Sequence, residues 1–142
     1  MVQDRPTVLN VSAVDAFETV TSETNARLVD VRTRAEWTFV GLPDLPGSAH
    51  DPILLEWQSF PTMSVDSDFG QTLEGACPDK TTALYFLCRS GARSLAAAKV
   101  MSERGYTRCF NVADGFEGPP NAEGHRGTVS GWKADGLPWR QS

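Results

Sequence analysis

One segment of the sequence decides the fold that we predict: Ala83-Leu84-Tyr85-Phe86-Leu87-Cys88-Arg89-Ser90-Gly91-Ala92-Arg93-Ser94. Its first five residues form a continuous apolar run, which is typical of a strand covered on both faces. A helix is expected from about Ser94 to Arg104, because small alanines there permit close approach to a sheet and Gly105 can end the helix. The segment therefore predicts a strand, a tight loop and a helix in succession.

Further elements on either side follow the same alternation. Short apolar runs predict more strands, and capping residues followed by helically spaced apolar residues predict more helices. Because strands and helices alternate, we predict an α/β domain with a mostly parallel sheet, and nothing in residues 1–142 suggests an internal boundary. The expected strands are 28–31, 48–53 and 108–112. One expected helix is capped by Ser12 and has Val14, Phe17 and Val20 on its apolar edge, and a second is capped by Thr33 and closed by Gly41. A third is expected at 66–77, with Phe69 and Leu73 on its inner face.

The last part of the chain gives weaker signals. Residues 117–130 are polar and glycine-rich without periodicity, which predicts a long loop of a kind that is usually functional or mobile. Residues 131–141 are expected to form a short helix and a packed tail. The role of the loop stays open, including whether His125 and Arg126 reach the mouth of the site.

Length and composition restrict the class of protein. The 142 residues suit one domain with a single hydrophobic core. A formal charge of -5 without clustered Lys or Arg argues against a nucleic-acid partner. No apolar run is long enough for a membrane span, and residues 1–11 lack the apolar core of a secretory signal. Three cysteines do not make a disulfide framework, so a reduced, cytoplasmic setting is expected.

The candidate site centres on Cys88, at the carboxyl end of the predicted strand. Ligands of open α/β sheets bind outside the carboxyl ends of strands, and a helix N-terminus there favours negative charge. Arg89 and Arg93 add positive charge, and Gly91 lets the backbone turn sharply. A lone cysteine that ends an apolar strand is often simply buried. Here the loop, the arginines and the helix act together, and we expect a nucleophilic thiolate in an anion cradle.

Other candidates carry less weight. Cys77 and Cys109 could react with Cys88, as resolving thiols or in a redox disulfide, although buried or idle thiols are the better interpretation. His50 and His125 lie too far apart in sequence for zinc spacing, so we expect no metal site and no organic cofactor. Asp30 and Arg32 could pair with each other or with the loop that contains Cys88, and a structural role is the better interpretation.

The segment 88–94 resembles the active-site loop of rhodanese-like sulfurtransferases. The resemblance extends in order to Leu28-Val29-Asp30-Val31-Arg32 with Glu36-Trp37, to Leu45-Pro46-Gly47-Ser48 and to residues 131–138. It implies a single rhodanese-like domain over residues 1–142, with a small central parallel sheet and helices on both faces.

The resemblance also implies a sulfurtransferase reaction. Cys88 would take a sulfane sulfur from thiosulfate or a related small anionic donor, and the resulting persulfide would pass it to cyanide, a thiol or a protein acceptor. The residues implied to bind the substrate are Arg89, Ser90, Gly91, Ala92, Arg93 and Ser94.

Two alternatives and the identity of the donor stay open. Related phosphatases of the cell-cycle type have five residues between cysteine and arginine. The four residues between Cys88 and Arg93 favour sulfur transfer over a phosphatase or arsenate reductase. A non-catalytic binding module is disfavoured because such relatives often lose the cysteine. Ser90 and Glu36 depart from the thiosulfate enzymes and Arg89 departs from the mercaptopyruvate enzymes, so the sequence does not name the donor.

Overall fold

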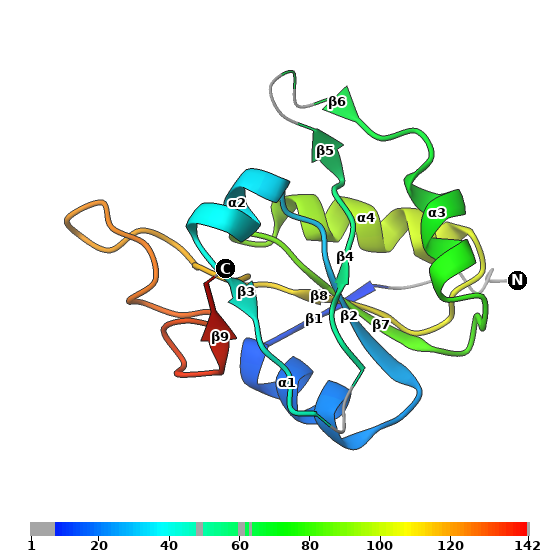
Figure 1. The fold of residues 1–142 in the computed structure, drawn as a ribbon, viewed down its shortest axis with the longest axis horizontal. Helices are drawn as coiled ribbons and strands as arrows, with labels where there is room; N and C mark the ends of the chain where they lie inside the picture. Colours follow the sequence, from blue (N-terminus) through cyan, green and yellow to red (C-terminus); the bar gives the residue numbers. More distant parts are fainter. Residues whose placement is uncertain (1–7, 48–49, 60–61, 63, 142) are drawn as a thin grey trace, which may run out of the picture.

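The computed structural model describes residues 8–47, 50–59, 62 and 64–141. Five parallel strands form the central sheet, with the helices packed around it (Figure 1). The order across the sheet is β1 (Val8–Val11), β8 (Cys109–Val112), β7 (Ala83–Leu87), β2 (Ala26–Asp30) and β4 (Ile53–Leu54).

Strand β7 lies at the centre of the sheet, which confirms the prediction that the apolar run 83–87 is a buried strand. All five of its residues are buried. It pairs with β2 on one side, where Phe86 lies opposite Val29, and with β8 on the other, where Leu84 lies opposite Cys109. A strand covered on both faces needs apolar side chains at every position, which explains why β7 shows no polar alternation.

Helices cover both faces of the sheet, as predicted. Helix α1 (Ala13–Ser22) packs on one face, together with the C-terminal segment. Helices α3 (Phe69–Ala76) and α4 (Ala92–Glu103) pack on the other face, where Phe69 and Leu73 of α3 are buried as expected. Helix α2 (Arg34–Phe39) has no buried residue and begins at a capping box formed by Thr33 and Glu36.

Two small antiparallel pairs complete the secondary structure. Strand β3 (Leu42–Pro43) pairs with β9 (Trp139–Arg140), which ties the end of the chain to the segment after α2. Strand β5 (Gln58–Ser59) pairs with β6 (Ser64–Val65). Residues 117–130 contain no helix or strand, which confirms the predicted long loop, and they project away from the sheet (Figure 1).

Several expected elements differ from the structure. The strand expected at 48–53 is reduced to β4, and Ser48 and Ala49 lie outside the described residues. No helix forms within 131–141, because Gly131 and Gly136 take positive φ values and the segment runs in turns to β9. The edge strand β1 was not predicted; it is four residues long and its Leu9 is exposed, so it lacks the apolar run of a central strand.

The inner faces of two helices also differ in detail. Helix α1 turns Ala13, Ala16 and Val20 inward, whereas Val14 is exposed, because small residues let the helix approach the sheet closely. Helix α4 begins at Ala92, two residues before the expected Ser94. Within the part of the chain that the structure describes, no helix is long and apolar enough to cross a membrane.

Candidate active site

Cys88 follows β7 directly and lies at the carboxyl end of the sheet. The Gly91 N–H donates a hydrogen bond to its Sγ at 3.1 Å. Gly91 has φ +107°, and a Cβ there would collide with the carbonyl oxygen of Ala113, so the turn requires glycine. Cys88 is only 1% exposed, so its sulfur is almost completely covered by the surrounding residues.

A chain of buried polar groups leads away from the thiol. The Ser94 hydroxyl lies 3.2 Å from Cys88 Sγ and donates to Asn111 Oδ1 at 2.5 Å. Asn111 in turn donates through Nδ2 to Asn10 Oδ1 at 3.0 Å. Ser94 and Asn111 are buried, so this chain fixes the hydroxyl beside the sulfur and satisfies groups that would otherwise be unpaired.

Arg93 is held by a carboxylate from α2. Its two terminal nitrogens bind the two Glu36 oxygens at 2.6 and 2.9 Å, a bidentate ion pair whose partners are both less than one-fifth exposed. Burial alone would raise the pKa of Glu36, but hydrogen bonds from Arg93 and from Thr33, with the Arg93 charge, outweigh it and lower the pKa to about 2. Glu36 is therefore ionised at neutral pH.

A hollow of about 540 Å³ opens at this end of the sheet. Two arginines and two glutamates line it, namely Arg89, Arg93, Glu36 and Glu117, together with the neutral side chains of Thr33, Val40 and Gln58. A second hollow, of about 240 Å³, lies along β3 and β4 and includes none of the predicted site residues.

The segment after β8 is hydrogen-bonded to the cysteine loop, which we define as residues 88–91. Phe116 N–H donates to the Cys88 carbonyl at 2.8 Å, and the N–H groups of Glu117 and Gly118 both donate to the Arg89 carbonyl at 3.1 Å. Gly115 has φ +68°, and a Cβ there would collide with the carbonyl oxygens of Cys88 and Arg89. The first residues of the long loop at 117–130 are therefore hydrogen-bonded to the backbone of the loop that contains Cys88.

A buried ion pair lies next to the site, at the end of β2, and it is the first of the two pairings that the sequence left open. Arg32 binds Asp30 at 2.6 Å, and both side chains are fully buried. The Arg32 guanidinium also lies 4.2 Å from the centre of the Phe116 ring and donates to the Gly41 carbonyl. These contacts connect the end of β2 with the turn after α2 and with Phe116, which is hydrogen-bonded to the Cys88 carbonyl. The ion pair therefore has a structural role.

The structure places the predicted site residues in three groups. Cys88, Gly91 and Ser94 are in direct contact, and Arg89 and Arg93 line the hollow. Ser90 and Ala92 are exposed on the loop.

Sequence reasoning missed the roles of three residues at the site. It noted Glu36 only as part of the family resemblance and as a departure from the thiosulfate enzymes, and it did not single out Asn111 or give Glu117 a role in the site. A polar residue inside the apolar strand 108–112 was a usable signal for Asn111.

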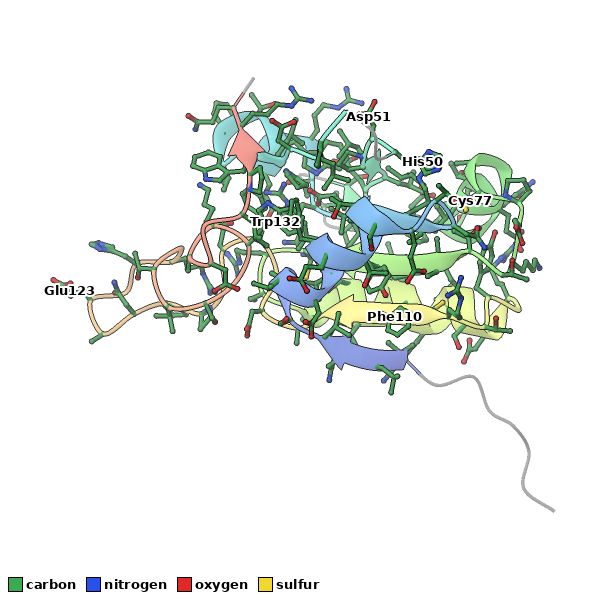
Figure 2. The ribbon with its side chains drawn as sticks, turned by 90° about the horizontal axis from the view of Figure 1, so that it is seen from below. His50, Asp51, Cys77, Phe110, Glu123 and Trp132 are labelled. Carbon is green, nitrogen blue, oxygen red and sulfur yellow. The ribbon has the colours of Figure 1, made fainter. Side chains whose placement is uncertain are left out.

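The other thiols and histidines lie apart from this arrangement. Burial raises the pKa of Cys109 to about 12, which makes that thiol unreactive. Figure 2 shows Cys77 at the end of the sheet opposite to Trp132. His125 is exposed and is not among the residues that line the hollow. The described ranges contain no cluster of three His, Cys, Asp or Glu side chains that could hold a metal ion.

Comparison with known proteins places the chain in a family. The model of the STR4 middle domain family matches residues 9–142. The chain belongs to the STR4 middle domain family. The crystal structure of Rv0390 from M. tuberculosis is 43% identical to it, with a TM-score of 0.84, covering 94% of this chain and 97% of that one. The two chains therefore share the same fold over nearly their whole lengths.

More distant structures show which fold this STR4 middle domain has. A polysulfide-sulfur transferase homodimer from Wolinella succinogenes is 20% identical with a TM-score of 0.65, covering 95% of this chain and 80% of that one. A rhodanese with anions from E. coli is 18% identical with a TM-score of 0.52, covering 82% of this chain and 99% of that one. The STR4 middle domain described above therefore has a rhodanese-like fold.

Proposed function

We propose that the protein is a sulfurtransferase that carries a sulfane sulfur as a persulfide on Cys88. One observation carries the proposal: the Cys88 Sγ lies between the Gly91 N–H at 3.1 Å and the Ser94 hydroxyl at 3.2 Å, at the end of the sheet where the arginine-lined hollow opens. The Gly91 N–H donates to the sulfur and so stabilises negative charge on it. The structural neighbour from Wolinella, a polysulfide-sulfur transferase, supports this chemistry.

In the first step the Cys88 thiolate attacks the terminal sulfur of the donor. A bond forms between Sγ and that sulfur, and the bond between the sulfur and the rest of the donor breaks. The electron pair leaves with the rest of the donor, which is sulfite when the donor is thiosulfate. The product on the enzyme is Cys88–S–S⁻, an intermediate of nucleophilic covalent catalysis.

In the second step an acceptor thiolate or cyanide attacks the outer sulfur of the persulfide. The sulfur–sulfur bond breaks, and its electron pair returns to Cys88 as thiolate. The N–H groups at the start of α4, which have no acceptor inside the helix, would stabilise the charge on the outer sulfur. The expected partners are a small sulfur donor and a thiol or protein acceptor, and the proposed setting is the cytoplasm.

Mass spectrometry tests the proposal directly. The protein is incubated separately with thiosulfate, mercaptopyruvate and cysteine persulfide, and Cys88→Ser serves as the control. We expect Cys88 to gain the mass of one sulfur atom with at least one donor, and the substituted protein to gain nothing at that position. If no donor loads Cys88 while phenyl phosphate or arsenate is turned over, the protein is a phosphatase or reductase. If neither occurs, the domain acts only in binding.

A further inference from the structure

The charges at the mouth of the hollow balance one another. Arg89 and Arg93 contribute two positive charges, and Glu36 and Glu117 contribute two negative charges. The pKa of Glu36 is lowered to about 2, so its charge is present throughout the neutral range. The neighbouring pair of Asp30 and Arg32 is buried and adds no net charge. The four charged side chains that line the hollow therefore carry no net charge between them.

Arg93 is also paired with the carboxylate of Glu36. Both of its terminal nitrogens are occupied by Glu36, at 2.6 and 2.9 Å, in a partly buried pair. The pair uses two of the five guanidinium N–H donors and neutralises the charge of Arg93, so Arg93 attracts an incoming anion less than an unpaired arginine would. Among the residues that the structure describes, no carboxylate pairs with Arg89. Arg89 therefore offers one positive charge to a donor.

The two classes of donor place different charge beside the thiolate. With thiosulfate, Cys88–S⁻ and S₂O₃²⁻ give Cys88–S–S⁻ and SO₃²⁻, so three negative charges share the mouth throughout the step. With an organic persulfide, Cys88–S⁻ and R–S–SH give Cys88–S–SH and R–S⁻, so one negative charge is present. Because repulsion grows with the product of the charges, a balanced mouth disfavours the dianion.

The size of the hollow also favours an organic donor over thiosulfate. A space of about 540 Å³ falls within the range of sites for organic ligands and far exceeds what a thiosulfate ion fills. Thr33, Val40 and Gln58 give it a neutral wall that suits an organic group.

We infer that Glu36 is a specificity-determining residue that selects against dianionic donors, and that the donor class of Cys88 is an organic persulfide. The inference rests on the proposed function, because it names the donor of the same persulfide. Glutamine at position 36 is the informative substitution, since it keeps a side chain that can bind Arg93 and serve the capping box while it removes the charge.

The experiment compares two donors by quenched mass spectrometry of Cys88, at matched ionic strength. The donors are thiosulfate and cysteine persulfide, and the quantity compared is the ratio of their second-order rate constants. We expect the wild-type protein to react faster with the persulfide. Glu36→Gln should raise the thiosulfate-to-persulfide ratio by about tenfold, and Glu117→Gln by about threefold. The control Glu18→Gln removes the same charge from the exposed side of α1 and should leave the ratio within about twofold.

The outcomes separate the two proposals. If neither donor loads wild-type Cys88, the proposed function fails. If Cys88 is loaded, but thiosulfate is the faster donor and neither Glu36→Gln nor Glu117→Gln changes the ratio, the donor assignment is wrong while the function stands. If Glu36→Gln slows both donors by disturbing Arg93, Glu117→Gln decides, because Glu117 is not a partner of Arg93. An unchanged ratio in that variant then overturns the inference.

Discussion

At the scale of single residues, the Ser94 hydroxyl is the neighbour of the Cys88 sulfur whose contribution can be tested by a single substitution. It lies 3.2 Å from Sγ and is held from behind by Asn111 at 2.5 Å. The hydroxyl donates to Asn111 Oδ1 while Cys88 is a thiol; when Cys88 ionises, the same proton can turn to the thiolate, so Ser94→Ala removes a donor worth about 1 kcal/mol. We expect alkylation of Cys88 by iodoacetamide at pH 8 to slow by about fivefold.

The matched control is Ser102→Ala. Ser102 is also buried on α4, but eight positions further along the helix, so its loss should change the alkylation rate by less than about twofold. Equal rates in wild-type protein and Ser94→Ala would show that the hydroxyl does not stabilise the thiolate. Mass spectrometry must assign the adduct to Cys88, since three thiols are present.

Glu36 links the site to acid stability. Its pKa of about 2 lies below the ordinary pKa of 4.5 for a glutamate, so its ion pair stabilises the folded state fully above pH 4.5 and loses that effect as the pH falls toward 2. Glu36→Gln should lower the free energy of unfolding by about 2 kcal/mol at pH 7 and by progressively less below pH 4.5. Urea denaturation at pH 7, 4 and 3 measures the difference.

The exposed Glu103 on α4 provides the comparison for this measurement. Glu103→Gln should change the free energy of unfolding by less than about 0.5 kcal/mol at every pH. A Glu36→Gln effect that stays constant from pH 7 to pH 3 would contradict the assigned titration. It would point to lost packing instead.

The residue types at the site could be predicted only in part. Cys88, Gly91, Arg93 and Ser94 lie within one short segment, so local chemistry and spacing were enough to single them out. Glu36 lies 57 positions from Arg93, and Asn111 lies 17 positions from Ser94. Such pairs form only when strands and helices pack, and no local pattern in one sequence reports them.

At the scale of elements, the junction between β7 and α4 depends on one backbone conformation. Gly91 has φ +107°, and a Cβ there would collide with the carbonyl oxygen of Ala113. Gly91→Ala should therefore cost about 2 kcal/mol or more in unfolding free energy, from strain and from displacement of the segment after β8.

Gly75 offers a control with the opposite expected sign. It lies in α3, and a Cβ there meets nothing within 4 Å. Gly75→Ala should stabilise the protein by up to about 1 kcal/mol, because alanine favours the helix. Thermal unfolding of both variants checks the contrast. Similar losses in both would mean that the conformation at Gly91 is not the sensitive feature.

Elements were predictable where burial imposes a pattern. Strand β7 was predicted because both of its faces are buried, and the Thr33 cap of α2 because capping is local. Strands β4 and β9 are two residues long and depend on pairing with distant segments. An expected helix in the tail failed because its glycines fit turns better than helical backbone.

At the scale of the whole molecule, the site collects segments from the carboxyl ends of three adjacent strands. Strand β2 leads to the Asp30–Arg32 pair and α2, β7 leads to Cys88, and β8 contributes Asn111 and the support of the loop. Parallel pairing brings these ends to one edge, which explains why residues distant in sequence meet there. The rest of the sheet and its helices hold that edge in place.

The loop at 117–130 is an addition to this framework. A Cβ on Gly118 would collide with the Ser130 carbonyl, so the two ends of the loop are in contact. Inside it, Arg126 donates to the Gly118 carbonyl and the Gly127 N–H donates to the Glu117 carbonyl, both at 2.7 Å. Figure 2 shows Glu123 at the outer tip, away from the sheet. These contacts stay within the loop, as in an Ω-loop.

Replacement of residues 119–129 by Gly-Ser-Gly should therefore leave the fold intact. The ends already lie together and a shorter loop costs less entropy to close, so we expect the unfolding free energy to change by no more than about 1 kcal/mol. The alkylation rate of Cys88 should stay within about twofold. Trp132→Ala, which empties a fully buried position just after the loop, should instead cost about 3–5 kcal/mol in urea denaturation. A comparable loss on loop replacement would show that the loop is part of the core structure.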